Sequence, residues 1–158
     1  MTAELKQEYT RRISQANRSG IIVIVYELAD QYLKEAEDAI AVGSKDEYTR
    51  QCHAAMDCVQ HLLNALDDSY ELAIPLMNLY VYINKEISMS CARYDTERLG
   101  VARKQLAELG LSFAEVAKAD ASKPVMENSQ SVYAGLTYGK GTLNENLSDQ
   151  GGNRGFQA

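Results

Sequence analysis

Two stretches of this chain are apolar at nearly every position, which is more than a helix packed on one side requires. Residues 72–83 are apolar or aromatic except at Pro75 and Asn78, and residues 21–26 are apolar throughout. A surface helix of a globular protein buries a single stripe about 100° wide. The surplus side chains of these two stretches therefore face either a second layer of the protein's own fold or a bound partner.

The N-terminal part of the chain is expected to be helical. A short helix over about residues 4–14 has Leu5, Tyr9 and Ile13 on one face. Residues 21–26 have strong strand propensity, but no second strand-like segment is present to pair with them. Because a lone strand leaves its backbone groups unpaired, we interpret this region as part of a long helix over about residues 19–42.

Local signals mark the ends of the next helices. Gly43 is a typical helix stop, and Ser44 with Glu47 forms a capping box that predicts a third helix. The apolar positions of that helix recur at three-four spacing: Cys52, Ala55, Met56, Val59, Leu62, Leu63 and Leu66. Pro75 is tolerated only in a first helical turn, so a fourth helix is expected to begin near Leu72.

A fifth helix is expected after Asp95 or Thr96, either of which is a suitable cap. Its apolar stripe consists of Leu99, Ala102, Leu106, Leu109, Phe113 and Val116. Gly110 lies inside it, at a cost of about 1 kcal/mol relative to Ala. Four long helices with short connections predict an all-α fold, an antiparallel four-helix bundle with a short additional N-terminal helix.

Residues 121–158 differ in composition from the bundle domain over residues 1–120. They are rich in Gly, Asn and Ser, which predicts a largely irregular C-terminal tail. The tail nevertheless carries spaced apolar residues: Val132, Tyr133, Leu136, Tyr138, Leu143, Leu147 and Phe156. Such spacing is typical of a segment that docks, either on its own bundle or, in a swapped oligomer, on a neighbouring molecule.

Charge and cysteine content narrow the class of protein. The net charge is −6 and no basic stripe is present, which argues against a nucleic-acid partner. The longest apolar run falls far short of the ~18 residues that a membrane helix requires, so no membrane insertion is expected. The chain opens without a secretory signal, and its three cysteines have no framework spacing, so reduced thiols in the cytosol are expected.

No catalytic or metal-binding pattern is evident. A di-iron bundle requires Glu three residues before each ligating His, but Arg50 precedes His53 and Cys58 precedes His61. Cys52, Cys58 and His61 lie on one predicted helix, whereas structural zinc draws its ligands from separate segments. There is also no phosphate-cradling glycine loop and no Ser-His-Asp order. We therefore expect no cofactor and no metal, and nothing in these motifs argues for an enzyme.

A series of residues in the helical part is similar, in order and spacing, to one known family. The series consists of Tyr9 and Ile13, then Val25-Tyr26-Glu27, Leu66-Asp67, Leu76-x-x-Leu79-Tyr80-x-Tyr82, and finally Ala92, Asp95 and Leu99. It spans roughly residues 5–119 and resembles the flagellin-specific export chaperones of the FliS family. Gly20 and Phe113 stand near positions where that family often has Pro and Trp.

This resemblance implies a cytosolic chaperone that binds the disordered C-terminal segment of flagellin. Relatives prevent premature polymerisation and deliver flagellin to the flagellar type III export apparatus, other components of which are further expected partners. Leu76, Leu79 and Ile83 are then expected to face the core. The predicted client-binding residues are Tyr9, Ile13, Ile22, Tyr26, Met77, Tyr80, Val81 and Asn84.

Two further hypotheses remain open. The apolar residues of the tail would compete with the client if they lay in the same groove. A different class of protein, a phosphotransfer or signalling adaptor module, would use an exposed histidine on the bundle. Such modules typically have Lys and Gly three and four residues after the His, whereas Met56 and Asp57 follow His53.

Overall fold

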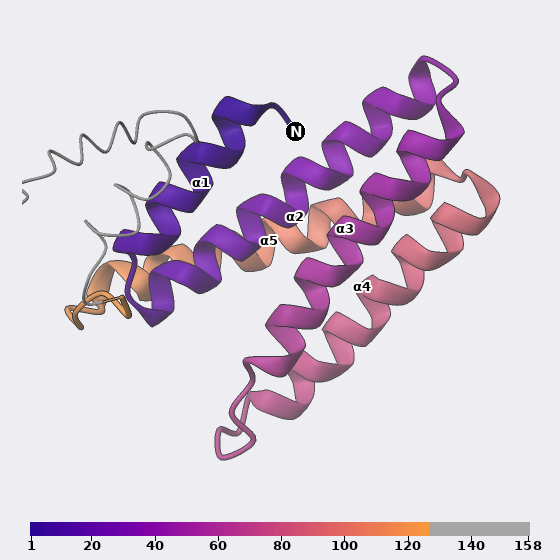
Figure 1. The fold of residues 1–158 in the computed structure, drawn as a ribbon. Coiled ribbons are helices and arrows are strands. Elements are labelled where there is room, and N and C mark those ends of the chain that lie inside the picture. Colours follow the sequence, from indigo (N-terminus) through magenta and orange to yellow (C-terminus); the bar gives the residue numbers. More distant parts are fainter. Residues whose placement is uncertain (127–158) are drawn as a thin grey trace, which may run out of the picture. The chain divides into compact units, whose positions relative to one another are not determined.

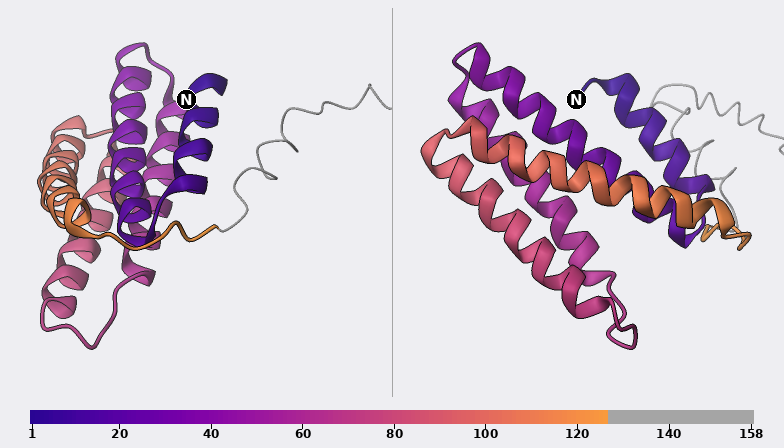
Figure 2. Two further views of the ribbon diagram at one scale, coloured as in Figure 1. Left: turned by 90° about the vertical axis from the view of Figure 1, so that its left-hand side faces the viewer. Right: turned by 180° about the vertical axis from the view of Figure 1, so that it is seen from behind.

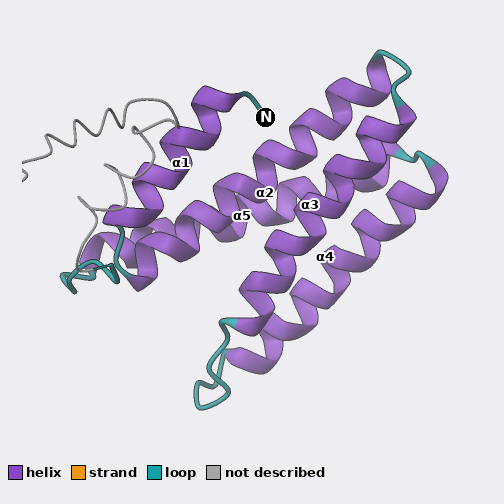
Figure 3. Ribbon diagram, viewed as in Figure 1, coloured by secondary structure: helices purple, strands orange, loops and turns teal. Residues whose placement is uncertain are grey.

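The structure, a computed structural model, describes residues 1–126 of the chain. Those residues form five α-helices and no strand (Figures 1 and 3). The helices are α1 (Ala3–Gln15), α2 (Arg18–Ala41), α3 (Lys45–Asn64), α4 (Ala73–Arg93) and α5 (Thr96–Ala119). The predicted all-α class is confirmed. The predictions about the tail fall on residues outside the described part, except for its first six residues.

The four long helices form a ring. α2 and α4 each contact both α3 and α5, while α1 contacts only α2 among the helices. Consecutive long helices run antiparallel (Figures 1 and 2), which confirms the four-helix bundle with an additional N-terminal helix. α3 and α4 form a hairpin whose connecting loop, residues 65–72, lies apart from the turn between α1 and α2.

Local chemistry explains the helix boundaries at four points. The Asn17 side chain accepts a hydrogen bond from the Gly20 amide at 2.8 Å and caps α2. Gly43 ends that helix with a φ of +78°, in the region that favours glycine. The Asp95 side chain accepts hydrogen bonds from the first amides of α5. Pro75 lies in the first turn of α4, where its missing N–H has no helical partner to lose.

The predicted capping box at the start of α3 is wrong. Ser44 precedes the helix but makes no side-chain capping bond. The Glu47 carboxylate instead accepts hydrogen bonds from Arg50 and Gln51, each at 2.5 Å, within its own helix. These competing donors take the carboxylate away from the helix end. α3 begins at Lys45 nevertheless, because the Tyr48 amide donates to the Ser44 carbonyl.

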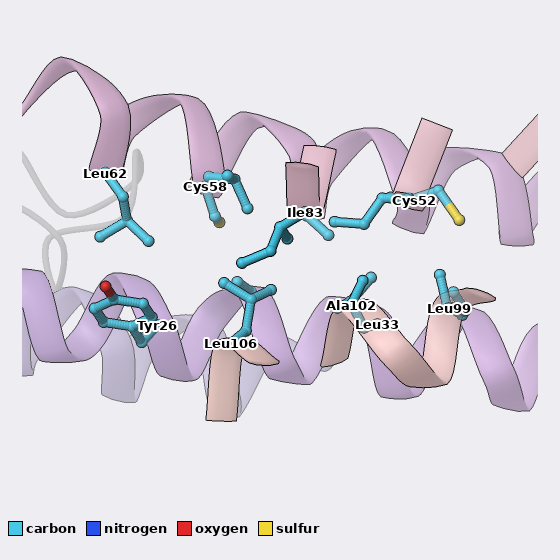
Figure 4. Close-up of a cluster of buried hydrophobic side chains, with 14 of the residues drawn as sticks. Tyr26, Leu33, Cys52, Cys58, Leu62, Ile83, Leu99, Ala102 and Leu106 are labelled. Carbon is cyan, nitrogen blue, oxygen red and sulfur yellow. The ribbon is translucent and has the colours of Figure 1, made fainter. Parts of the chain in front are cut away.

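The core is built by one face of each long helix, as Figure 4 shows. Its members include Tyr26 and Leu33 from α2, Cys52 and Leu62 from α3, Ile83 from α4, and Leu99 and Leu106 from α5. The predicted stripes on α3 and α5 therefore face the core over most of their length. Val116, near the end of α5, is an exception at 64% exposed.

Gly110 explains why α5 passes so close to α2. A Cβ atom at Gly110 would stand 3.2 Å from the Cβ of Tyr26. The glycine therefore lets the two helices approach at this point, and α5 continues unbroken through it. The Phe113 ring lies one turn further along, with its centroid 5.3 Å from that of Tyr26. The local cost of the glycine is offset by this aromatic packing.

Candidate binding surfaces

Tyr26 and Tyr80, two of the predicted client-binding residues, meet inside the core. Tyr26 is 2% exposed and Tyr80 is 1% exposed, and their hydroxyls share a hydrogen bond. Burial, followed by that hydrogen bond, raises the pKa of Tyr26, and burial raises the pKa of Tyr80. Each phenol is thus a neutral group that satisfies the other, which removes the cost of an unpaired buried hydroxyl.

The expectation that Tyr80 lies on the outer side of α4 is wrong. Tyr80, Ile83 and Ile87 follow three-four spacing, and all three side chains are buried. They form the inner stripe of α4. The sequence does not reveal this, because a tyrosine hydroxyl is buried in a core only where it has a hydrogen-bond partner. That partner, Tyr26, lies 54 positions earlier in the chain.

The outer side of α4 exposes the surplus apolar residues that the pattern predicts. Ile74 is 66% exposed, Met77 43% and Val81 55%. Their spacing places them on one helical face, opposite the buried Ile83. Because α4 contacts only α3 and α5, no other helix among residues 1–126 covers this side. We call this surface the α4 face; it consists of Leu72, Ile74, Met77, Val81 and Tyr82.

Asn84 lies one turn after Val81 and is half-buried. Its Oδ1 atom is buried and accepts no hydrogen bond from residues 1–126, a feature shared only with Oε1 of Gln105 among the described side chains. A buried acceptor without a donor costs about 1–3 kcal/mol. Asn84 Oδ1 is thus a buried acceptor for which residues 1–126 supply no donor.

The remaining predicted residues lie on a different side of the bundle. Tyr9 and Ile13 on α1 and Ile22 on α2 are half-buried. α1 is held to α2 by a two-pronged pair in which Arg12 donates to both oxygens of Glu27, and this hydrogen bond raises the pKa of Arg12. α1 does not contact α4. The eight predicted residues thus form two groups, joined through the core by the tyrosine pair.

Residues 1–120 match the family model described as Flagellar protein FliS. The chain belongs to the FliS family. The match covers all five helices and ends at Asp120, the C-cap of α5. No curated protein matches the chain. FliS proteins are flagellar export chaperones rather than enzymes, so binding surfaces are the functional features to seek.

A groove between α1 and α5 was not foreseen from the sequence of this FliS-family chain. It encloses about 420 Å³ and carries Arg11, Arg12 and Lys118 around a floor that includes Val23 and Ile24. The basic side chains are already engaged: Arg11 pairs with Glu8, and Lys118 pairs with Glu115. Only the tertiary fold brings Lys118 beside the two arginines, which is why no local pattern predicts this groove.

The segment after α5 returns to the turn between α1 and α2. The Asn17 side chain donates to the carbonyl of Asp120 at 3.0 Å, and the Ser19 hydroxyl donates to its carboxylate at 2.5 Å. The Val125 amide donates to the Ala16 carbonyl at 3.1 Å. The hydrogen bonds from Ser19 and Ser122 lower the pKa of Asp120 to about 2. The first residues of the tail are thus tied to the bundle.

The cysteines and histidines of the chain show no arrangement for chemistry. The three cysteines form no disulfide, and burial raises the pKa of Cys52 to about 12 and that of Cys58 to about 11. Both thiols therefore stay protonated at neutral pH. Among residues 1–126, no three metal-ligating side chains come together, and none of the helices could cross a membrane.

Proposed function

We propose that this FliS-family chain binds the disordered C-terminal segment of flagellin in the cytosol and presents it to the flagellar export apparatus. The observation that supports this most is the α4 face, an exposed apolar stripe on a side of α4 that no other helix in the described part of the chain covers. Isolated apolar residues are normal on protein surfaces, but contiguous ones mark interaction sites.

The spacing of the α4 face suits a helical client. Ile74, Met77 and Val81 repeat at three and four residues, as in surfaces that receive an amphipathic helix. Methionine is flexible and polarisable, so Met77 can adapt to different apolar partners. Ordering a disordered segment costs several kcal/mol, and apolar contact along the face offsets that cost.

The other predicted contacts form a separate part of this proposal. Tyr9, Ile13 and Ile22 are half-buried around α1 and α2, on a side that α4 does not touch. A single straight helix bound to the α4 face does not contact them. Substitutions on α1 therefore test a second contact of the client, independently of substitutions on α4.

The decisive experiment titrates the purified full chain with a synthetic peptide of the flagellin C-terminal segment. We expect heat release in calorimetry and a gain of helix in circular dichroism. The double variant Met77→Asp with Val81→Asp should weaken binding about 30-fold or more, the loss that a central apolar pair typically causes. No binding by the wild-type chain at high micromolar peptide would reject the proposal.

A matched control separates the α4 face from general loss of surface apolar area. Val42→Asp with Val116→Asp introduces the same charges at two side chains that are 80% and 64% exposed, away from α4. This variant should bind the peptide as the wild type does. If both double variants weaken binding equally, the client lies elsewhere on the protein. Thermal unfolding of both variants shows that any loss is not loss of fold.

The phosphotransfer alternative receives little support. His53 and His61 are exposed on α3, which is the one feature such a module shares. The Lys and Gly that typically follow the phosphorylated histidine are missing, and the family match points to an export chaperone. Acid-labile phosphate on either histidine after incubation with a phosphodonor would revive it.

A further inference from the structure

A long stretch of the α3–α4 hairpin contains no Lys or Arg. It covers residues 51–84, which form most of α3, the connecting loop and the first half of α4. These residues include Asp57, Asp67, Asp68 and Glu71, and Lys85 is the first cation after them. The stretch itself therefore contributes only negative charge, while Arg18 of α2 is near enough to help lower the pKa of Asp67.

Acidic and large apolar side chains alternate at the end of this hairpin. Tyr70 is 69% exposed and Leu72 is 68% exposed, and Asp67, Asp68 and Glu71 beside them are exposed as well. We call residues 67–72 the acidic tip. In Figure 1 it is the loop between α3 and α4, at the end of the hairpin away from the turn between α2 and α3. A purely solvated loop has no reason to expose such side chains between its charges.

The acidic tip is held in a defined shape by its own hydrogen bonds. Oδ1 of Asp67 accepts from the Ser69 amide at 3.0 Å and from the Ser69 hydroxyl at 2.6 Å. These bonds lower the pKa of Asp67, so its negative charge persists under mildly acidic conditions. The Ala73 amide donates to the Tyr70 carbonyl at 3.0 Å and joins the tip to α4. The surface is therefore preorganised for binding.

The negative charges of the tip are available to a partner. Neither Asp68 nor Glu71 forms an ion pair with a residue in 1–126, whereas many other carboxylates of the bundle do. Arg103, for example, contacts both Asp30 and Glu37 at 2.7 Å. Unpaired exposed carboxylates beside apolar residues are the complement of a segment that carries both apolar and basic side chains.

The tip continues directly into the α4 face. Leu72 is the N-cap of α4 and links the tip to the helix. Ile74 then begins the apolar stripe, Met77 and Val81 continue it, and exposed Lys85 follows one turn later. The stripe therefore has acidic residues at one end and a lysine at the other. A bound helix with charge at one end finds attraction in one direction and repulsion in the reverse direction.

We infer that the acidic tip and the α4 face form one docking surface, with opposite charges at its two ends, for an amphipathic segment with Lys or Arg at one end of its apolar stripe. The basic end lies over Asp68 and Glu71, and the other end lies near Lys85. This inference deepens the proposed function, on which its use of the α4 face rests, by assigning the charge pattern and the direction of the bound segment.

Two probe peptides test the charge requirement with the full chain. Both are amphipathic helices with the same apolar stripe; one has four lysines at its C-terminal end, and the other has four glutamates there. We expect the lysine probe to bind at low salt and the glutamate probe to bind at least ten-fold more weakly. The difference should shrink in 1 M salt, where screening acts within about 3 Å.

Variants of the tip locate the effect. Asp67→Asn, Asp68→Asn and Glu71→Gln together should weaken the lysine probe about ten-fold, since each exposed pair contributes a few tenths of a kcal/mol. Asn keeps the Oδ1 acceptor for Ser69. The variant Asp68→Asn with Glu71→Gln leaves Asp67 in place and should show a smaller loss in the same direction, so a disturbed turn cannot mimic the result.

The control removes equal charge elsewhere. Glu4→Gln, Asp38→Asn and Asp46→Asn neutralise three exposed carboxylates on α1, α2 and the start of α3, none of them in an ion pair with a described residue. This control should change the affinity less than two-fold. Equal weakening by tip and control variants would mean that only net charge matters, and equal binding of the two probes would likewise overturn the inference.

A spin label on the lysine end of the probe tests the direction. It should broaden the NMR signals of Tyr70 and Leu72, and a label on the opposite end should broaden those of Lys85; the reverse pattern contradicts the inference. The two proposals also fail separately. If the flagellin peptide does not bind but binding of the lysine probe depends on the tip, flagellin is rejected as the client and the charged docking surface is retained. If binding of the flagellin peptide depends on Met77 and Val81 but the two probes bind equally, flagellin is retained as the client and the charge requirement is rejected.

Discussion

α2 and α4 carry almost the same apolar surplus in sequence, yet the fold uses it in opposite ways. Every residue in 21–26 of α2 is buried or half-buried, whereas Ile74, Met77 and Val81 of α4 are exposed. The difference lies in their neighbours: α2 contacts α1, α3 and α5, while α4 contacts only α3 and α5. The number of covering helices, rather than hydrophobicity, decides whether a surplus becomes core or surface.

This contrast implies that α1 does for α2 what the proposed client would do for α4. α1 lies along the third side of α2 and is fastened by Arg12 and Glu27. α4 has no such cover among residues 1–126. The next three predictions test the contrast, beginning with the largest expected effect.

The same substitution should have very different consequences on the two helices. Ile24 of α2 is 4% exposed and Val81 of α4 is 55% exposed. Ile24→Asp buries a carboxylate and should lower the free energy of unfolding by about 4 kcal/mol or more, enough to unfold many domains. Val81→Asp should change it by about 0.5 kcal/mol or less. Urea unfolding measures both, and equal losses would contradict the distinction.

The tyrosine pair that links α2 to α4 should behave as a unit. Tyr80→Phe leaves the buried Tyr26 hydroxyl without its partner and should cost about 1–2 kcal/mol of stability. Removing both hydroxyls, with Tyr26→Phe and Tyr80→Phe, should restore part of this loss, because no orphaned group remains. A double-mutant cycle in urea gives the coupling energy. Strictly additive losses would show that the hydroxyls do not depend on each other.

The segment beyond α5 packs at the start of α2, and its smaller contribution to stability should depend on pH. The pKa of Asp120 is lowered from 3.8 to about 2, so the folded state favours the charged form. The resulting stabilisation is complete above the unfolded pKa and is lost as the pH falls through the range from about 4 to 2. The protection of the Val125 amide against hydrogen exchange should therefore fall across that window. Ser19→Ala should raise the folded-state pKa of Asp120, so the loss of protection should be complete at a higher pH.

Much of the fold follows from local chemistry in the sequence. Asn17, Gly43 and Asp95 end or begin helices through contacts within a few residues, so their roles are predictable. The strand propensity of residues 21–26 is overridden because the helix offers them burial against three neighbours. The pair Ser44 and Glu47 predicts a capping box that does not form, because donors within α3 compete for the Glu47 carboxylate.

The binding surfaces are less predictable because they depend on distant pairings. The exposure of Met77 and Val81 follows from helical spacing, but the burial of Tyr80 requires knowledge of Tyr26. Likewise, Gly110 is predicted only to destabilise its helix, and its role in the close packing of α5 against α2 is evident only once the Tyr26 side chain is located beside it. The grouping of eight predicted residues into two sides of the bundle requires the position of α1, which the pattern of α1 itself does not specify.

The absence of Lys and Arg between Arg50 and Lys85 also shapes how this surface can be observed. Trypsin has no cleavage site within that stretch, so a digest releases the acidic tip and the whole α4 face as one peptide. Amine-reactive cross-linkers have no lysine to attack there. Mass spectrometry would instead detect client binding through oxidative footprinting of Met77 and Tyr70, or through carboxylate cross-linking at Asp68 and Glu71.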